Sequence, residues 1–222
     1  MTSRSRRLLF TARTVLFDWD GTLLDSYAAD ARAYAAMFAA LGIEWNEEML
    51  ARHYSPDWYR VYRAARIPRA HWPKADRVWR RAYARETSLL LPGARKTIQS
   101  LARNFQLGIV SSGSRARVRK QIRALELHEY FSACVCAEDA ERRKPHPAPL
   151  HLALKRLRAR ADDCVYVGDT PEDIEMARRA GMRVIGVRGP FPSSKRLHIA
   201  RPDLLMDSVA ELPKFLQRLK EK

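Results

Sequence analysis

The sequence predicts an α/β fold whose core is a doubly wound, mostly parallel sheet with an inserted all-helical cap domain. Short apolar runs at 15–17, 106–110 and 164–167 are typical of strands buried on both faces. From residue 92 onward, runs of this kind alternate with helical segments, which is the pattern of a parallel sheet. Together these observations favour a Rossmann-like architecture.

A helical insertion separates the first predicted strand from the second. Residues 43–91 contain no buried-strand pattern, and four of the five tryptophans fall there. We therefore expect a core domain formed by residues 1–24 and 90–222, and a cap domain formed by residues 25–89.

The elements of the first half follow from capping and helix-breaking residues. An Ala-rich helical pattern begins after Ser26 and stops at Gly42, and later helices are delimited by prolines. The predicted helices are 27–41, 46–53, 56–65 with Ser55 as its N-cap, and 73–88.

The second half alternates more regularly, and Pro92-Gly93 marks its beginning. The predicted helices are 94–104, 115–125, 149–157, 171–180 and 208–219. The predicted strands are 106–110, 133–136, 164–167, 184–187 and 204–206.

Composition narrows the classes of protein that the chain can represent. Its 222 residues are 46% hydrophobic and 30% charged, which is ordinary for a folded domain, but the net charge is +16. Such a charge is compatible with nucleic acid, a membrane surface, an anionic substrate or a simple bias toward arginine. Because the basic residues are spread along the chain, we favour the last explanation and expect neither a membrane nor a nucleic-acid partner. The sequence does not indicate the oligomeric state.

The cysteines and the apolar runs bear on location. Cys134, Cys136 and Cys164 cannot all pair with one another and lack metal-ligand spacing, so we expect reduced thiols in a reducing compartment. The apolar run at 8–10 is too short for a signal peptide, and no run has transmembrane length. The expected location is cytoplasmic.

Chemically active side chains follow the predicted strands. At the carboxyl edge of a doubly wound sheet, four segments would meet: Asp18 and Asp20, Ser111 and Ser112, Lys144, and Asp169 with Glu172 and Asp173. Two carboxylates about 4 Å apart repel by roughly 4 kcal/mol at an effective dielectric constant near 20. A hard cation such as Mg²⁺ relieves this repulsion, and Lys144 adds a fixed positive charge. The set suits phosphoryl transfer through an aspartyl-phosphate.

These motifs resemble those of the haloacid dehalogenase-like (HAD) hydrolases, and in particular the phosphoglycolate phosphatase-like members with a C1-type cap. The four matching segments, in the family's order, are 17–22, 109–112, 144–145 and 168–173. The resemblance implies a phosphoric monoester hydrolase that depends on Mg²⁺ and acts on a small phosphorylated metabolite. Asp20 favours a phosphatase or a phosphomutase within the family.

The resemblance also assigns catalytic roles. Asp18 is the expected nucleophile and a metal ligand, and Asp20 the expected acid and base, with its backbone carbonyl on the metal. Ser111 and Lys144 are expected to bind the transferring phosphoryl group.

Further positions complete the expected metal and phosphate sites. Asp169 is expected to ligate Mg²⁺ directly, and Asp173 through water. The residues expected to bind the substrate are Gly21, Thr22, Ser112 and Gly113.

The insertion supplies candidates for specificity. The turn at 53–56 occupies the place of a substrate-specificity loop in similar proteins, which makes His53, Tyr54 and Arg60 candidate substrate contacts. Tyr54, Trp58 and Tyr62 also have helical spacing, and for these aromatic residues we favour packing into the core of the insertion. For His53 both interpretations remain open.

Some charged residues have simpler interpretations. We expect the basic helix at 115–123 to present a solvated face, and Glu172 to be a first-turn acid that favours the helix dipole. Two rival functions remain: a phosphomutase on a sugar phosphate that uses the same site, and a basic nucleic-acid-binding protein with a vestigial site.

Overall fold

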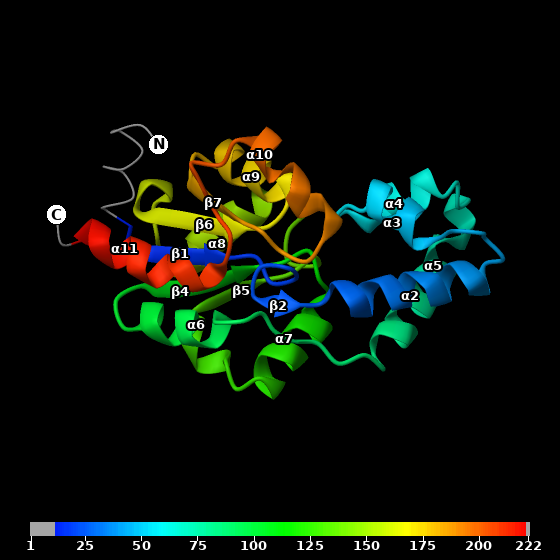
Figure 1. Ribbon diagram of the computed structural model, residues 1–222, viewed down its shortest axis with the longest axis horizontal. Helices are drawn as coiled ribbons and strands as arrows, with labels where there is room; N and C mark the ends of the chain where they lie inside the picture. Colours follow the sequence, from blue (N-terminus) through cyan, green and yellow to red (C-terminus); the bar gives the residue numbers. More distant parts are fainter. Residues whose placement is uncertain (1–11, 221–222) are drawn as a thin grey trace.

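A six-stranded parallel sheet forms the centre of the structure, a computed structural model that describes residues 12–220 (Figure 1). Its strand order is β5-β4-β1-β6-β7-β8, and each neighbouring pair is parallel. The strands are β1 (Thr14–Phe17), β4 (Gln106–Val110), β5 (Ala133–Val135), β6 (Cys164–Gly168), β7 (Arg183–Val187) and β8 (Leu204–Met206). The predicted α/β class is confirmed. The N-terminal segment, from which we argued against a signal peptide, lies outside the described residues.

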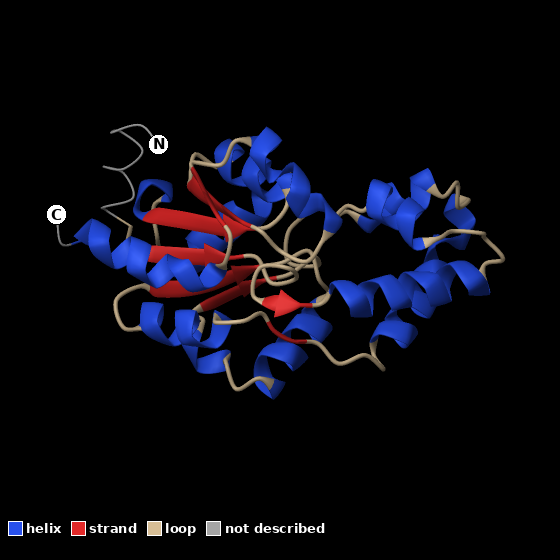
Figure 2. Ribbon diagram, in the orientation of Figure 1, coloured by secondary structure: helices blue, strands red, loops and turns tan. Residues whose placement is uncertain are grey.

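Helices cover both faces of this sheet (Figure 2). The apolar cluster on one face combines sheet residues with α6 (Ala94–Ala102), α7 (Arg115–Ala124) and α11 (Leu212–Lys220). The cluster on the other face involves α8 (Ala148–Leu157), α9 (Pro171–Arg179) and α10 (Leu197–Ala200).

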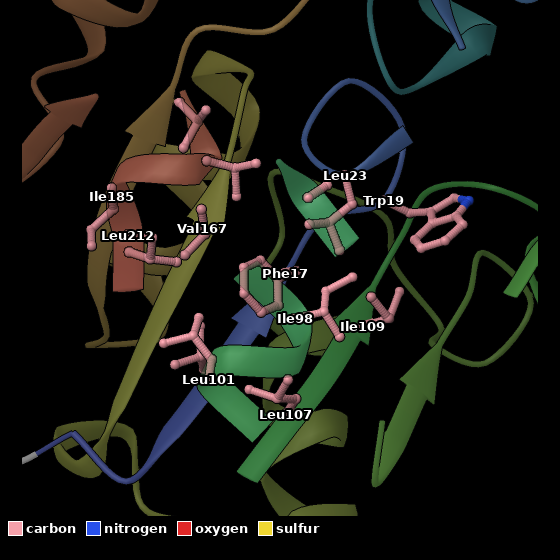
Figure 3. Close-up of a cluster of buried hydrophobic side chains, with 14 of the residues drawn as sticks. Phe17, Trp19, Leu23, Ile98, Leu101, Leu107, Ile109, Val167, Ile185 and Leu212 are labelled. Carbon is pink, nitrogen blue, oxygen red and sulfur yellow. The ribbon is translucent and has the colours of Figure 1, made fainter. Parts of the chain in front are cut away.

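Strand β1 shows why its sequence is apolar throughout. Phe17 packs with Ile109 and Val167 beneath α6 (Figure 3), whereas Leu16 points to the opposite cluster. All four residues of β1 are buried. Because burying one large apolar side chain contributes about 1.5–3 kcal/mol, both clusters hold β1 at the centre of the sheet.

A group of helices lies beyond the carboxyl ends of the strands (Figure 1). This helical insertion contains α2 (Tyr27–Ala40), α3 (Glu47–His53), α4 (Trp58–Ala64) and α5 (Trp72–Tyr83). It has an apolar cluster of its own, in which Tyr34, Phe38, Leu50 and Val61 are buried.

The insertion departs from the expected pattern at its edges. The last helix ends at Tyr83, five residues before the predicted end, and a short strand β3 (Leu89–Leu90) follows. This strand pairs antiparallel with β2 (Leu24–Asp25), so that a two-stranded ribbon links the insertion to the core.

The N-cap predicted for α4, Ser55, is wrong. The N-cap is Asp57, whose carboxylate accepts a hydrogen bond from the Tyr59 amide at 3.3 Å. Ser55 instead donates to Glu172 in the core, at 3.1 Å between the two oxygens. The hydroxyl of Ser55, which the local pattern assigned to the helix N-terminus, therefore makes a long-range hydrogen bond to Glu172.

Two further differences concern the last 30 residues. The short helix α10 has no counterpart in our prediction, and the closing helix begins at Leu212 after a 3₁₀ turn, Val209–Glu211, that Ser208 caps. No helix within the described part of the chain is both long and apolar enough to span a membrane.

Candidate active site

The carboxyl ends of three adjacent strands bring the first candidate residues together. Asp18 follows β1, Ser111 follows β4 and Asp169 follows β6, and β1 lies between the other two strands. The amide of Asp18 donates to the carbonyl of Val167 at 2.8 Å, which continues the strand pairing up to the carboxylate. The chain adds β4 and β5 on one side of β1 and then β6, β7 and β8 on the other, and such a switch point is where open α/β sheets bind ligands.

Lys144 lies between two of the acids. Its Nζ is 2.5 Å from Oδ1 of Asp18 and 2.8 Å from Oδ1 of Asp173, and its side chain is almost completely buried. Burial alone would lower the pKa of Lys144, but the charges of Asp173 and Asp18 outweigh it and raise the pKa. The amine is therefore a fixed cation directed at the carboxylate of Asp18.

The acids exceed the positive charge available to them. Burial, together with the charge of Asp173, raises the pKa of Asp18 to about 7 against the opposing effect of Lys144. Burial and the charges of Asp18 and Asp173 raise the pKa of Asp169 well above its usual range. One lysine does not balance three carboxylates in a buried site.

The same three acids fit a divalent metal ion. Asp18, Asp169 and Asp173 each offer a carboxylate oxygen, and these oxygens lie within 4.8 Å of one another. Oδ2 of Asp169 is buried and has no hydrogen-bond partner within residues 12–220, while its Oδ1 accepts from the hydroxyl of Thr22 at 3.1 Å. An all-oxygen set with an unsatisfied carboxylate oxygen is what a hard divalent cation requires.

Asp173 is held in place from its own helix and from β6. Its Oδ2 accepts from the hydroxyl of Thr170 at 2.7 Å within the capping box that begins α9. Its Oδ1 accepts from the hydroxyl of Tyr166 at 2.9 Å. Tyr166 was not predicted from the sequence, where the only available signal was a hydroxyl-bearing residue within an apolar strand.

Asp20 has a different partner. Arg117, on α7, binds it through two parallel contacts, Nη1 to Oδ1 at 2.8 Å and Nη2 to Oδ2 at 2.6 Å. Burial would raise the pKa of Asp20, but the charge and hydrogen bonds of Arg117 outweigh it and lower the pKa. The guanidinium group also lies over the ring of Tyr83, 4.9 Å from its centroid.

Arg117 is therefore an exception to the solvated face expected for this basic helix. It directly precedes Val118, which is buried, and lies one turn before Gln121, which flanks the buried Ile122. Its place beside these apolar positions was the signal that could have identified it.

The loop after β4 leads into α7 and offers polar groups. Ser111 is buried, and its Oγ accepts a hydrogen bond from the Gly113 amide at 2.9 Å. The hydroxyl of Ser112 is buried without a partner among the described residues, and both Ser112 and Gly113 line a cleft. An unpaired donor before a helix N-terminus suits an anion.

The turn after β1 brings the backbone close to Asp169. Gly21 has φ of +82°, and a Cβ on this residue would lie 2.9 Å from the carboxyl carbon of Asp169. Only glycine adopts this conformation readily and leaves space for the acid.

The cleft, with a volume of about 160 Å³, lies between the insertion and the carboxyl edge of the sheet. Asp18, Asp20 and Tyr54 line it, whereas His53 and Arg60 do not. The ring of His53 lies against Trp45, with centroids 5.7 Å apart, and Arg60 forms a 3.5 Å ion pair with Glu172. The structure therefore brings Tyr54 to the site and leaves the other two candidates of the insertion outside the cleft.

The aromatic residues of the insertion fit both alternatives considered for them, packing in its core and lining the site. Tyr62 is buried in the apolar cluster of the insertion, and Tyr54 and Trp58 pack against that cluster. All three also line the cleft. They therefore contribute to the core of the insertion and form the wall of the site at the same time.

Two side chains of the core, Glu172 and Arg143, contact the insertion around this cleft. Glu172 accepts from Ser55 and pairs with Arg60, so it connects the two parts as well as standing in the first turn of α9. Arg143 lies over the ring of Trp58, 3.8 Å from its centroid, and 3.8 Å from a carboxylate oxygen of Asp57.

Comparison with known proteins agrees with this geometry. The chain is 28% identical over 228 residues to the phosphoglycolate phosphatase of Escherichia coli strain K12, covering 90% of each protein. It is 26% identical to that of Photorhabdus laumondii, covering 93% of each. Among solved structures, CbbY from Rhodobacter sphaeroides in complex with phosphate is 26% identical, with a TM-score of 0.79 over 90% of this chain and 96% of that one.

A further structural relative has the same fold at lower identity. A phosphoglycolate phosphatase-like protein from Lactobacillus plantarum has a TM-score of 0.84 at 18% identity, covering 92% of this chain and 99% of that one. The sequence profile of the haloacid dehalogenase-like hydrolases matches residues 15–187, a span that contains every acid described above. The chain therefore belongs to the haloacid dehalogenase-like hydrolase family.

Proposed function

We propose that this enzyme is a Mg²⁺-dependent phosphatase that hydrolyses a small phosphorylated metabolite through an aspartyl-phosphate intermediate. The observation that carries the proposal is the carboxylate of Asp18, which contacts Lys144 and lies beside Asp169 and Asp173. A nucleophile, a fixed cation and a set of metal-ligating oxygens thus share one buried edge of the sheet.

In the first half of the reaction, a carboxylate oxygen of Asp18 attacks phosphorus and the bond to the leaving oxygen breaks. Asp20, which Arg117 holds as a carboxylate, must leave that pairing and take up a proton from solvent before it protonates the leaving oxygen. Lys144 and the donors of the loop after β4, including Ser111, stabilise the negative charge of the phosphoryl group.

In the second half, Asp20 takes a proton from a water molecule that attacks phosphorus and releases Asp18. When bound by Asp18, Asp169, Asp173 and the backbone carbonyl of Asp20, Mg²⁺ would supply positive charge against the phosphoryl oxygens. The donor set and the unpartnered oxygen of Asp169 support this assignment.

The helical insertion would act as the cap. In this proposal residues 25–89 close over the substrate and exclude water from the intermediate. The cleft between the two parts supports it, since lining residues come from both. Phosphoglycolate belongs among the compounds assayed because related proteins carry that activity in their names.

The substitution Asp18→Asn tests the proposal, with Asp25→Asn as the matched control. Asp25 lies seven residues after Asp18, in β2, and is exposed. With Mg²⁺ and a panel of phosphate monoesters, Asp18→Asn should lose activity by at least about 10³-fold, and the control should keep it. Substantial Mg²⁺-dependent hydrolysis by the Asp18→Asn variant would rule the mechanism out.

A further inference from the structure

Asp30 is a buried acid in the cleft that the phosphoryl-transfer chemistry does not use. It lies in the first turn of α2, is 7% exposed and lines the cleft together with Asp20. Its place near the helix N-terminus favours a negative charge. Burial and the nearby charge of Asp20 nonetheless raise its pKa to about 7.

The partners of Asp30 are neutral. Trp79 donates its Nε1 hydrogen to Oδ1 of Asp30 at 3.1 Å, and Tyr54 forms a second hydrogen bond. No basic side chain among residues 12–217 forms an ion pair with it. The charge of Arg117 also acts on Asp30, but that guanidinium is already paired with Asp20 at 2.6 Å, so the buried carboxylate of Asp30 keeps an unbalanced charge in a cleft that a ligand must enter.

The basic side chains that line the cleft already have partners. Their closest carboxylate contacts are Arg117 with Asp20 at 2.6 Å, Arg80 with Asp76 at 3.6 Å, and Arg143 with Asp57 at 3.8 Å. An anionic substituent on the leaving group of a substrate would therefore find only paired cations, and the unpaired charge of Asp30 would repel it.

Aromatic rings form the rest of this wall. Those that line the cleft from the insertion are Tyr34, Tyr54, Trp58, Tyr59, Tyr62, Trp79 and Tyr83. On α5, Trp79 follows a second acid, Asp76, by three residues, so both face the cleft from one side of the helix. Aromatic faces beside a carboxylate are a recognition surface for an organic cation.

We infer that the insertion side of the cleft selects phosphate monoesters whose leaving group carries a cationic amine, with Asp30 as the residue that determines this specificity. The inference rests on the proposed phosphatase function and names its substrate class, the aminoalkyl phosphates. Asp30 contacts the amine, while Asp18 and Lys144 act on the phosphoryl group at the other end of the substrate.

Four phosphate esters with two-carbon leaving groups test the inference: 2-aminoethyl, 2-hydroxyethyl, ethyl and carboxymethyl phosphate, the last of which is phosphoglycolate. We expect kcat/KM for the aminoethyl ester to exceed that for the ethyl ester by about tenfold, as one charged hydrogen bond provides. The carboxymethyl ester should be the poorest. A kcat/KM for the carboxymethyl or hydroxyethyl ester equal to or above that for the aminoethyl ester would overturn the inference.

Asp30→Asn removes the charge and should lower the aminoethyl-to-ethyl ratio of kcat/KM by about tenfold. Glu48→Gln is the control, because Glu48 is an exposed acid on α3 that does not line the cleft, and it should keep the wild-type ratio. Thermal unfolding verifies that both variants are folded. An unchanged ratio in Asp30→Asn contradicts the inference.

Binding separates this inference from the proposed function. The affinities of the four esters for the Asp18→Asn variant, measured by calorimetry, should follow the same order without any turnover. If the order holds but no ester is hydrolysed by the wild-type protein, the proposed function fails and the specificity stands. If the esters are hydrolysed with a different order of affinity, the specificity fails alone.

Discussion

At the scale of single residues, the pair formed by Asp20 and Arg117 shows how one partner controls a buried acid. Arg117→Met would leave Asp20 buried without a counter-charge, and we expect the free energy of unfolding to fall by about 3 kcal/mol. Arg119→Met removes an exposed arginine from the same helix and should cost less than about 0.5 kcal/mol.

Chemical denaturation measures both losses. The double variant Asp20→Asn/Arg117→Met should lose less stability than the sum of the losses in Asp20→Asn and Arg117→Met, because it leaves no buried unpaired charge. Equal losses for Arg117→Met and Arg119→Met would show that the pair does not contribute to stability.

Asp30 gives a prediction about pH at the same scale. Its pKa is about 7 in the folded protein and about 3.9 in an unfolded chain. Between these values the folded state binds more protons, so the contribution of Asp30 to stability is present at low pH and is lost as the pH rises toward 7.

Asp30→Asn should therefore flatten the decline in stability between pH 4 and 7. Between pH 4 and pH 8 the stability of the variant relative to the wild-type protein should rise by about 4 kcal/mol, because one pKa unit corresponds to about 1.4 kcal/mol, and urea unfolding at several pH values resolves this change. Parallel stability curves for the two proteins would contradict the raised pKa.

The sequence predicted the acids of the site and missed their partners, for a physical reason. Asp18, Lys144 and Asp169 could be brought together because each stands at a fixed place in a strand or loop that the apolar pattern reveals. The pairing of Arg117 with Asp20, and of Ser55 with Glu172, depends on where a helix face or an inserted loop lies in space. The local pattern can place Arg117 beside the buried positions of its helix, but it contains no information on which acid the side chain contacts.

At the scale of elements, the turn after β1 is a sensitive point. Gly21 and Gly42 both have positive φ, but a Cβ at Gly21 would collide with Asp169, whereas Gly42 has open space around it. Gly42→Ala should cost about 1 kcal/mol through backbone strain alone.

Gly21→Ala should cost clearly more and should also reduce phosphatase activity, because it displaces a candidate metal ligand. Thermal unfolding and an activity assay of the two variants make the comparison. Similar losses of stability in both, with activity kept, would contradict the close packing of this turn.

Long helices and strands were predicted more accurately than short ones. The strand 106–110 was predicted with its exact bounds, and α6, α7, α8 and α9 within two residues, because each presents several apolar positions to the sheet. The closing helix α11 begins four residues later than predicted, and the short helix α10 was missed. The strands β2 and β3 were missed, since each has two residues and Leu89 is exposed. A pairing between segments that distant in sequence leaves no periodic signal.

At the scale of the whole molecule, a bound metal ion should join the loops after β1 and β6 and stabilise the folded state. At a concentration 100 times its Kd, Mg²⁺ should add about 2.7 kcal/mol to the free energy of unfolding. The rise in melting temperature should disappear in Asp169→Asn, and a salt control at equal ionic strength should not reproduce it. The same rise in wild type and variant would place the ion elsewhere.

The central claim concerns one covalent bond, between a carboxylate oxygen of Asp18 and phosphorus. The most direct measurement is to quench the wild-type protein with acid during turnover of a hydrolysed ester and to locate the phosphoryl group by peptide mass spectrometry. The account predicts a phosphoryl group on Asp18 that hydroxylamine removes, and none in the Asp18→Asn variant. A phosphoryl group on another residue, or turnover in the Asp18→Asn variant, would contradict it.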